Sequence, residues 1–101
     1  MLLYNITYAV PHSLKNEWLD WMNTVHIPEI LATGCFQRHL LLQLLEVDET
    51  EFRTYALQLF AEKETEYRKY QEKFAPKLRH QANTQWGENV LGFRTLMSVL
   101  D

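Results

Sequence analysis

The sequence has little of several residue types on which common kinds of protein depend. Its one cysteine, Cys35, cannot form a bridge within the chain, which favours a reducing compartment. Three glycines are too few for a glycine-rich loop that cradles a phosphate group. No apolar run approaches the roughly 20 residues of a membrane-spanning helix, and the first residues do not resemble a signal peptide. We therefore expect a cytoplasmic protein with no membrane partner.

The charge balance is slightly acidic. Ten basic and thirteen acidic residues give a net charge of −3, so the chain has no general attraction to a phosphate backbone and nucleic acid is not an expected partner. Hydrophobic residues make up 47% of the 101 positions, which is enough to build a core without disulfides or a structural metal. We expect residues 1–101 to form a single domain.

The pattern of apolar residues predicts six elements. Strands are predicted at 2–10, 36–47, 52–61 and 90–100, and helices at 13–26 and 64–85. Pro28 disfavours helical geometry at Ile27, so the first helix should end or kink near His26, whereas Pro76 should only kink the second. A solvated turn is expected at 48–51. The order βαββαβ predicts a ferredoxin-like α+β fold, a four-stranded antiparallel sheet with two helices on one face.

Side chains alternate along a strand, so each predicted strand presents two sets of residues. We expect the almost wholly apolar set to pack on the helices: Tyr4, Ile6, Tyr8, Val10, Phe36, Leu40, Leu42, Leu44, Tyr55, Leu57, Leu59, Leu91, Phe93, Met97 and Val99. The other set mixes polar and large apolar residues: Leu3, Asn5, His39, Leu41, Leu45, Gln58, Phe60, Arg94 and Leu96. An ordinary solvated face is the alternative interpretation. So many large apolar groups instead favour a homodimer through this mixed sheet face, with Asn5 and Gln58 needing hydrogen-bond partners there.

The stretch from Trp18 to Phe36 holds the best single functional candidate, His26. A histidine beside the helix break could shuttle protons near neutral pH, or it could cap the last carbonyls of the helix. A wider set of aromatic residues could line a ligand cavity or could simply form the core between helices and sheet: Tyr4, Trp18, Trp21, Tyr55 and Trp86. Arg94, on the mixed face, could hold a ligand carboxylate, pair with an acid across the dimer, or reach solvent.

Metal binding and common catalytic signatures are not indicated. His26 and Glu29 are three residues apart, but two ligands do not make a site, and the other histidines fall on separate elements. The sequence has no nucleophile elbow, no Ser-His-Asp set and no Cys-x-x-Cys pair. We expect no metal and no cofactor.

Several motifs along the whole chain together resemble a known family. They are Y-N-I-T at 4–7, W-L-D-W-M at 18–22, H-I-P-E-I-L-A-T-G-C-F at 26–36, Y-A-L-Q-L-F at 55–60, Y-Q-E-K-F-A-P-K-L at 70–78 and F-R-T-L at 93–96. This sequence resembles a bacterial family of unknown function that is similar to the dimeric α+β barrel superfamily. The resemblance implies that two ferredoxin-like sheets pack face to face. Members of that superfamily hold small, largely apolar ligands between sheet and helices, and some are cofactor-free monooxygenases or isomerases.

Three functional hypotheses follow. The first is a homodimer that binds a small apolar molecule or a protein partner without an assigned reaction. The second is a cofactor-independent monooxygenase- or isomerase-like enzyme on a small aromatic substrate, with His26 as acid or base. The third is a purely structural dimer. A cavity that reaches His26 would favour the first two over the third.

Overall fold

The computed structural model describes residues 1–47 and 50–101, and it has the predicted order of elements. The strands are β1 (Leu2–Pro11), β2 (Arg38–Gln43), β3 (Phe52–Ala61) and β4 (Leu91–Ser98). The helices are α1 (Lys15–Trp21), α2 (Ile27–Ala32), α3 (Glu64–Lys69) and α4 (Ala75–Trp86). A 3-10 turn (Gly87–Asn89) leads from α4 into β4. β2 is shorter than predicted, and Asp48 and Glu49 of the predicted turn lie outside the described residues.

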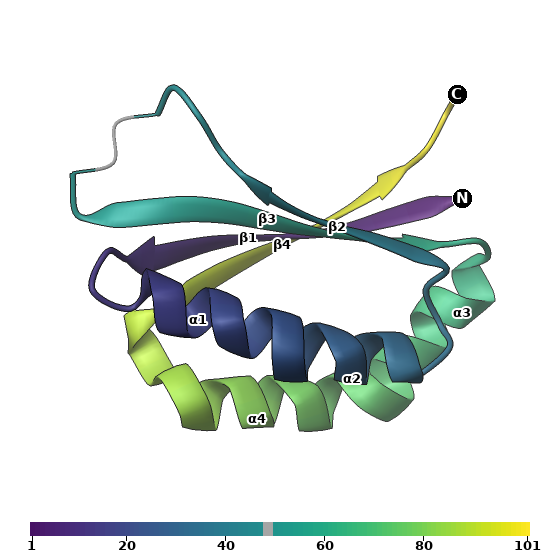
Figure 1. The fold of residues 1–101 in the computed structure, drawn as a ribbon. Helices are drawn as coiled ribbons and strands as arrows, with labels where there is room; N and C mark the ends of the chain where they lie inside the picture. Colours follow the sequence, from purple (N-terminus) through teal and green to yellow (C-terminus); the bar gives the residue numbers. More distant parts are fainter. Residues whose placement is uncertain (48–49) are drawn as a thin grey trace.

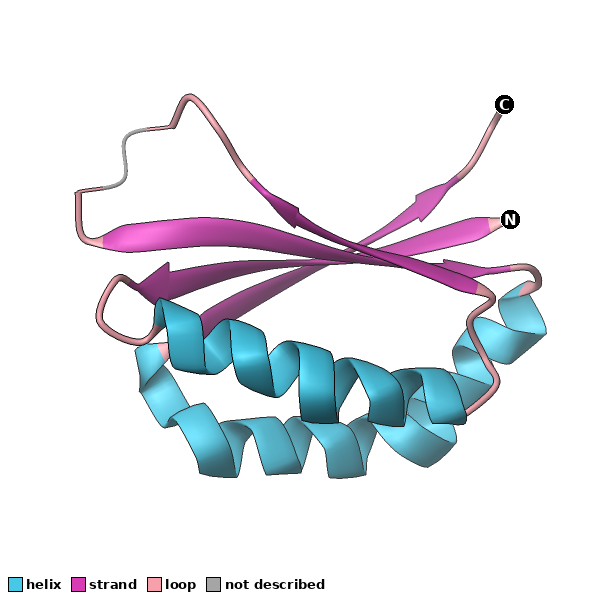
Figure 2. Cartoon of the chain, viewed as in Figure 1, coloured by secondary structure: helices cyan, strands magenta, loops and turns pink. Residues whose placement is uncertain are grey.

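The four strands form one antiparallel sheet in the order β2-β3-β1-β4. All helices lie against one face of this sheet, and no described helix or strand covers the other (Figures 1 and 2). We call these the covered face and the open face. The result is a flat, two-layered molecule of 39 × 32 × 19 Å. The ferredoxin-like α+β fold predicted from the order of elements is confirmed.

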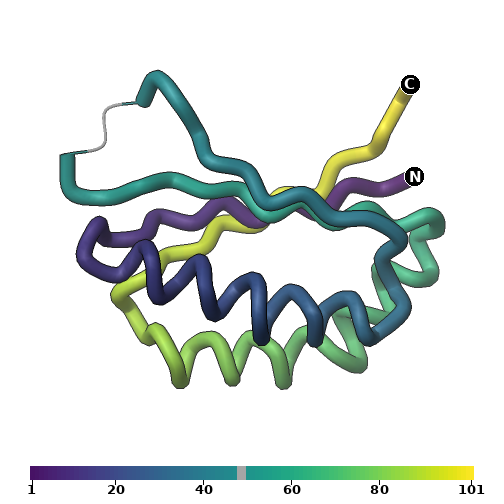
Figure 3. The backbone as a smooth tube through the Cα atoms, viewed as in Figure 1, coloured from purple at the N-terminus to yellow at the C-terminus, as the bar shows by residue number. Residues whose placement is uncertain are grey.

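Each of the two long helical segments contains a wide π-helical turn just before a proline. Met22–His26 joins α1 to α2, and Tyr70–Phe74 joins α3 to α4. Here the N–H groups of Ile27 and Ala75 donate to carbonyls five residues back. The next residue in each case is a proline, which has no N–H to donate and whose ring crowds the carbonyl four residues before it. The wider turn relieves this conflict, so the helical backbone continues to Ala32; of the end or kink expected near His26, the end is not observed. Figure 3 shows both helical segments continuing beneath the sheet.

The core lies between the helices and the two central strands. The register pairs Tyr4 with Leu59 and Ile6 with Leu57, and all four side chains are buried on the covered face. Trp18 and Met22 close the core from the helical side and are almost completely buried. The predicted faces of β1 and β3 are therefore correct.

The predicted faces of the two edge strands are wrong. In β4, Arg94 lies opposite Ile6 and Gly92 opposite Tyr8, and directly opposed residues share a face. Arg94 therefore lies on the covered face, while the apolar residues predicted to be in the core lie on the open face: Leu91, Phe93, Met97 and Val99. The register leaves a glycine and a long, flexible arginine beneath the helices, where larger apolar side chains would fill the space.

β2 shows the same reversal. His39 lies opposite Leu59 and Leu41 opposite Leu57, so these two residues of β2 are on the covered face. Leu40 and Leu42 are then on the open face, where Leu42 is exposed. Both edge strands thus turn their more apolar side away from the helices, and the open face is more hydrophobic than the sequence pattern predicted.

Candidate functional site: a cavity between the helices and the sheet

A cavity of about 170 Å³ lies between the helical layer and the covered face. Its lining comes mainly from β1, β4, α4 and the π-helical turns: Tyr4, Ile6, Tyr8, Trp18, Trp21, His26, Ile30, Tyr70, Leu78, Arg79, Ala82, Asn83, Trp86, Gly87, Val90, Gly92 and Arg94. Arg79, Asn83 and Arg94 are exposed, so the cavity reaches the surface. A dry cavity of about 150 Å³ is enough for one benzene ring. The space therefore fits a ligand with a single ring.

One end of the cavity is aromatic. All three tryptophans of the chain line the cavity. Trp18 packs on Tyr8 with ring centroids 5.0 Å apart. Trp21 and Trp86 meet edge to face at 5.9 Å and 73°. Tyr4 also lines the cavity, whereas Tyr55 packs behind Trp18 at 5.1 Å and does not.

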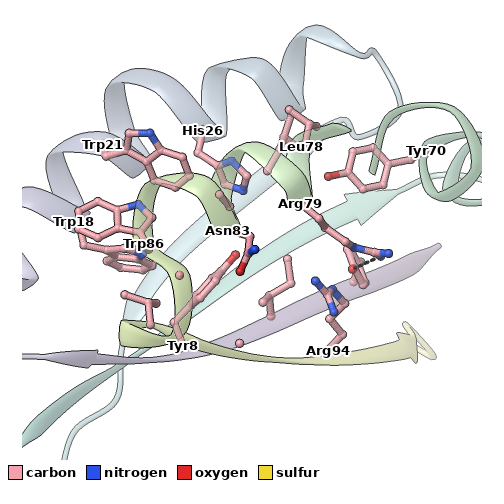
Figure 4. Close-up of a pocket in the computed structure, with 17 residues that line it drawn as sticks. Tyr8, Trp18, Trp21, His26, Tyr70, Leu78, Arg79, Asn83, Trp86 and Arg94 are labelled. Atoms are coloured by element: carbon pink, nitrogen blue, oxygen red, sulfur yellow. Dashed lines mark hydrogen bonds between the residues drawn. The ribbon is translucent and has the colours of Figure 1, made fainter. Parts of the chain in front are cut away.

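His26 lies at this aromatic end. It belongs to the first π-helical turn, is 7% exposed, and stacks on Trp21 with ring centroids 4.6 Å apart and planes at 17°. Figure 4 shows its imidazole directed into the cavity. Burial lowers its pKa to about 4, so the ring is neutral at pH 7. A neutral ring on a helix that continues past it does not serve as the cationic cap of a helix end. It can instead accept a proton or a hydrogen bond from a ligand.

Two polar side chains in the middle of the cavity were not among the predicted site residues. Tyr8 rises from β1 with its hydroxyl group towards Asn83 of α4 (Figure 4). Burial raises the pKa of Tyr8, so the hydroxyl stays protonated and can donate or accept. Gly92 lies directly opposite Tyr8 in the neighbouring strand, and a Cβ atom there would be in ordinary van der Waals contact with the ring, 3.4 Å from Tyr8 Cε1.

The other end of the cavity holds two arginines. Arg79 projects from α4 and Arg94 from β4, so they enter from opposite walls (Figure 4). Arg79 donates to the Tyr4 hydroxyl at 3.4 Å and to Gln71 Oε1. Burial raises the pKa of Tyr70, and the positive charges of both arginines oppose that rise. Both guanidinium groups are therefore near Tyr70.

Arg79 and Asn83 were not predicted, because the prediction for the second helix used only its apolar stripe. A signal was present, however. Ala75, Arg79 and Asn83 are spaced by four residues, so they run side by side with the buried stripe that contains Leu78 and Trp86. Polar residues at this spacing flank a buried face and indicate the rim of a pocket.

The predicted polar pair of the sheet lies elsewhere. Asn5 and Gln58 are directly opposite each other on the open face, away from the cavity. Asn5 is only 9% exposed, donates to Thr7 Oγ1 at 3.0 Å and accepts from Gln58 Nε2 at 3.4 Å. These residues form a small polar network in the middle of a hydrophobic surface. Arg94, expected beside them, is instead in the cavity.

In the ranges 1–47 and 50–101, no three His, Cys, Asp or Glu side chains are grouped so that they could hold a metal ion. Cys35 is fully buried beside Thr33. None of the helices that the structure describes has the length and apolar character needed to cross a bilayer.

These features define a class: a ferredoxin-like α+β protein with a small cavity between its helices and its sheet. Residues 1–100 match the domain of unknown function DUF4286, and the chain belongs to that family. No curated protein matches the sequence.

Solved structures share the fold at low sequence identity. A dimeric ferredoxin-like protein from an uncultured marine organism has a TM-score of 0.73 at 11% identity, covering 100% of this chain and 96% of that one. An EthD family protein from Bacillus halodurans has a TM-score of 0.70 at 11% identity, covering 99% and 100%. SnoaB, a cofactor-independent oxygenase from Streptomyces nogalater, has a TM-score of 0.62 at 13% identity, covering 99% and 94%. At these identities the similarity shows the fold alone.

Proposed function

We propose that this chain is a bacterial, cytoplasmic homodimer in which each subunit binds a small, largely apolar molecule between its helices and its sheet. The cavity of about 170 Å³ carries the proposal. Ligand pockets are typically concave and aromatic, with a few polar groups that fix orientation. Tyr8, His26 and Asn83 are such groups.

The open face supports the homodimer. Large apolar side chains remain exposed there, including Phe93 at 64% and Leu91 at 50%. The chain exposes 6525 Å², whereas a compact monomer of this mass exposes roughly 6,000 Å². The C-terminal residues and the chain after β2 rise on opposite sides of the open face (Figure 1), and they carry the exposed Leu45 and Leu100. A second copy packed on this face would cover these groups.

Ligand binding is testable with the protein's own tryptophans, since all three line the cavity. Native mass spectrometry of the purified protein should show added mass from a co-purified molecule. Titration with small aromatic probes should change the tryptophan fluorescence. Ala82→Leu, which fills the cavity from α4, should abolish both signals.

Ala32→Leu is the matched control, because Ala32 is exposed on α2 and does not line the cavity. It should leave both signals unchanged. Absence of added mass and of any saturable fluorescence change in the wild type would favour a purely structural dimer.

A second candidate function is cofactor-independent catalysis on a small aromatic substrate. The observation that favours it is His26, a buried and neutral imidazole at the aromatic end of the cavity. In such a reaction the unprotonated imidazole would accept a proton from the substrate, as a weak base whose pKa burial lowers to about 4. The test is His26→Gln with a ligand found by mass spectrometry: turnover should fall while binding persists. If the wild type returns the ligand unchanged under air, the binding function stands alone.

A further inference from the structure

The charge on the cavity lining is opposite to that of the whole chain. The protein has thirteen acidic and ten basic residues, yet the lining includes Arg79 and Arg94 and no aspartate or glutamate. His26 is neutral and adds no charge. Two guanidinium groups at one small cavity repel each other, and an anion placed between them would remove that repulsion.

No carboxylate of the residues that the structure describes neutralises either arginine. Arg79 is held by neutral acceptors, the Tyr4 hydroxyl at 3.4 Å and the Gln71 amide oxygen. Within the described part of the chain, neither Arg79 nor Arg94 lies within ion-pair distance of a carboxylate. Both side chains are partly open to solvent, so a ligand entering the cavity can reach them.

The cavity has two chemically different ends. Figure 4 shows the indole rings and His26 towards one end and the two guanidinium groups towards the other. A guanidinium group binds a carboxylate through parallel N–H donors, and such charge-assisted hydrogen bonds are about twice as strong as neutral ones. The volume leaves room for one ring beside the indoles.

We infer that the cavity takes a small aromatic acid, with its single ring among the tryptophans and its carboxylate between Arg79 and Arg94. This inference rests on the proposed function, and it adds the class of ligand. The arginines select for the anion, while the aromatic end binds the ring whatever its charge.

Pairs of acid and neutral amide separate these two contributions. Benzoate with benzamide, and phenylacetate with phenylacetamide, differ in charge at nearly constant shape. Each is titrated against the full-length protein by tryptophan fluorescence and by calorimetry. We expect the acids to bind the wild type about tenfold more tightly than the amides, and rising salt to reduce that ratio.

Arg79→Gln and Arg94→Gln should each lower affinity for the acids towards that for the amides, while amide binding is retained. Retained amide binding also shows that the variant is folded. Arg68→Gln is the control, because Arg68 is on α3, pairs with Glu64 and does not line the cavity.

The outcomes are distinct. Equal binding of acids and amides to the wild type would overturn the inference and leave the cavity as a neutral binding site. A preference for acids that survives in both variants would overturn it as well. If neither class of probe binds the wild type, the proposed binding function fails and this inference fails with it.

Discussion

The edge strands of the sheet reverse the distribution of polarity that the central strands show. Arg94 of β4 is on the covered face and lines the cavity together with Arg79 of α4, whereas the open face presents exposed Phe93, Leu91 and Leu42. In a monomer whose only task is to fold, the helices would cover the more apolar side of each edge strand. The proposed function accounts for this reversal, because a ligand would occupy the cavity and a second subunit would cover the open face. The predictions below separate these two roles.

Removing a large side chain from the core between the helices and the covered face should have the largest effect on folding. Trp18 is 1% exposed and packs on Tyr8 and Tyr55. Trp18→Ala should lower the free energy of unfolding by about 3–5 kcal/mol, measured by urea unfolding. Phe93→Ala on the open face should instead make stability more dependent on protein concentration. An equal, concentration-independent loss in both variants would contradict the division between the faces.

Acid should lower the free energy of unfolding through His26, which is buried between the helices and the covered face. Its pKa is about 4 in the folded protein and 6.5 in the unfolded chain, so between these values the unfolded chain binds more protons. Stability is therefore fully present above about pH 6.5 and falls as the pH drops towards 4, by up to about 3 kcal/mol.

The test measures urea unfolding between about pH 5 and 6.5, above the range in which most carboxylates titrate. His26→Gln should flatten the slope in this window. His80→Gln is the control, since His80 is exposed on α4 and should leave the slope unchanged. A slope that survives in His26→Gln would mean that another group is responsible.

The smallest effect is expected from the polar network of the open face. Asn5→Ala removes the acceptor of Gln58 and the donor to Thr7, and should lower the free energy of unfolding by about 1 kcal/mol. Thr95→Ala, at the position opposite Asn5 in β4, should change it less. A double-mutant cycle of Asn5→Ala and Gln58→Ala should show coupling of about 0.5 kcal/mol or more. Additive effects would show that the network contributes nothing.

How far the sequence led can be judged from particular strands. The element order and the faces of β1 and β3 were predictable, because in these two central strands the more apolar side is the one that packs on the helices. The faces of β2 and β4 were not, because the prediction placed the more apolar side of every strand against the helices. Phe93 and Arg94 show the error: the apolar side of β4 lies on the open face, where the proposed interface with another copy would cover it.

Most of the aromatic residues expected at a cavity do line the one that the structure has, whereas Tyr55 does not, and Arg94 reaches it from the face opposite to the expected one. Trp18, Trp21, Trp86, Tyr4 and His26 line the cavity, and aromatic residues at helical spacing suggested that. Arg79 is on α4 and Arg94 is on β4, and both line the cavity. Whether Arg94 faces α4 depends on the register of β4, which the sequence pattern did not give. Pro28 located the break near His26, but the pattern did not show that a π-helical turn carries the helix past it.

Sedimentation equilibrium of the wild type and of Phe93→Glu tests the reversal of the two faces most directly. The account predicts a wild-type mass of twice 12.1 kDa and a monomer for Phe93→Glu, because a buried unpaired charge opposes association. Val25→Glu, at a residue exposed on the helical layer, should remain a dimer. A wild-type mass of 12.1 kDa at high concentration would contradict the account.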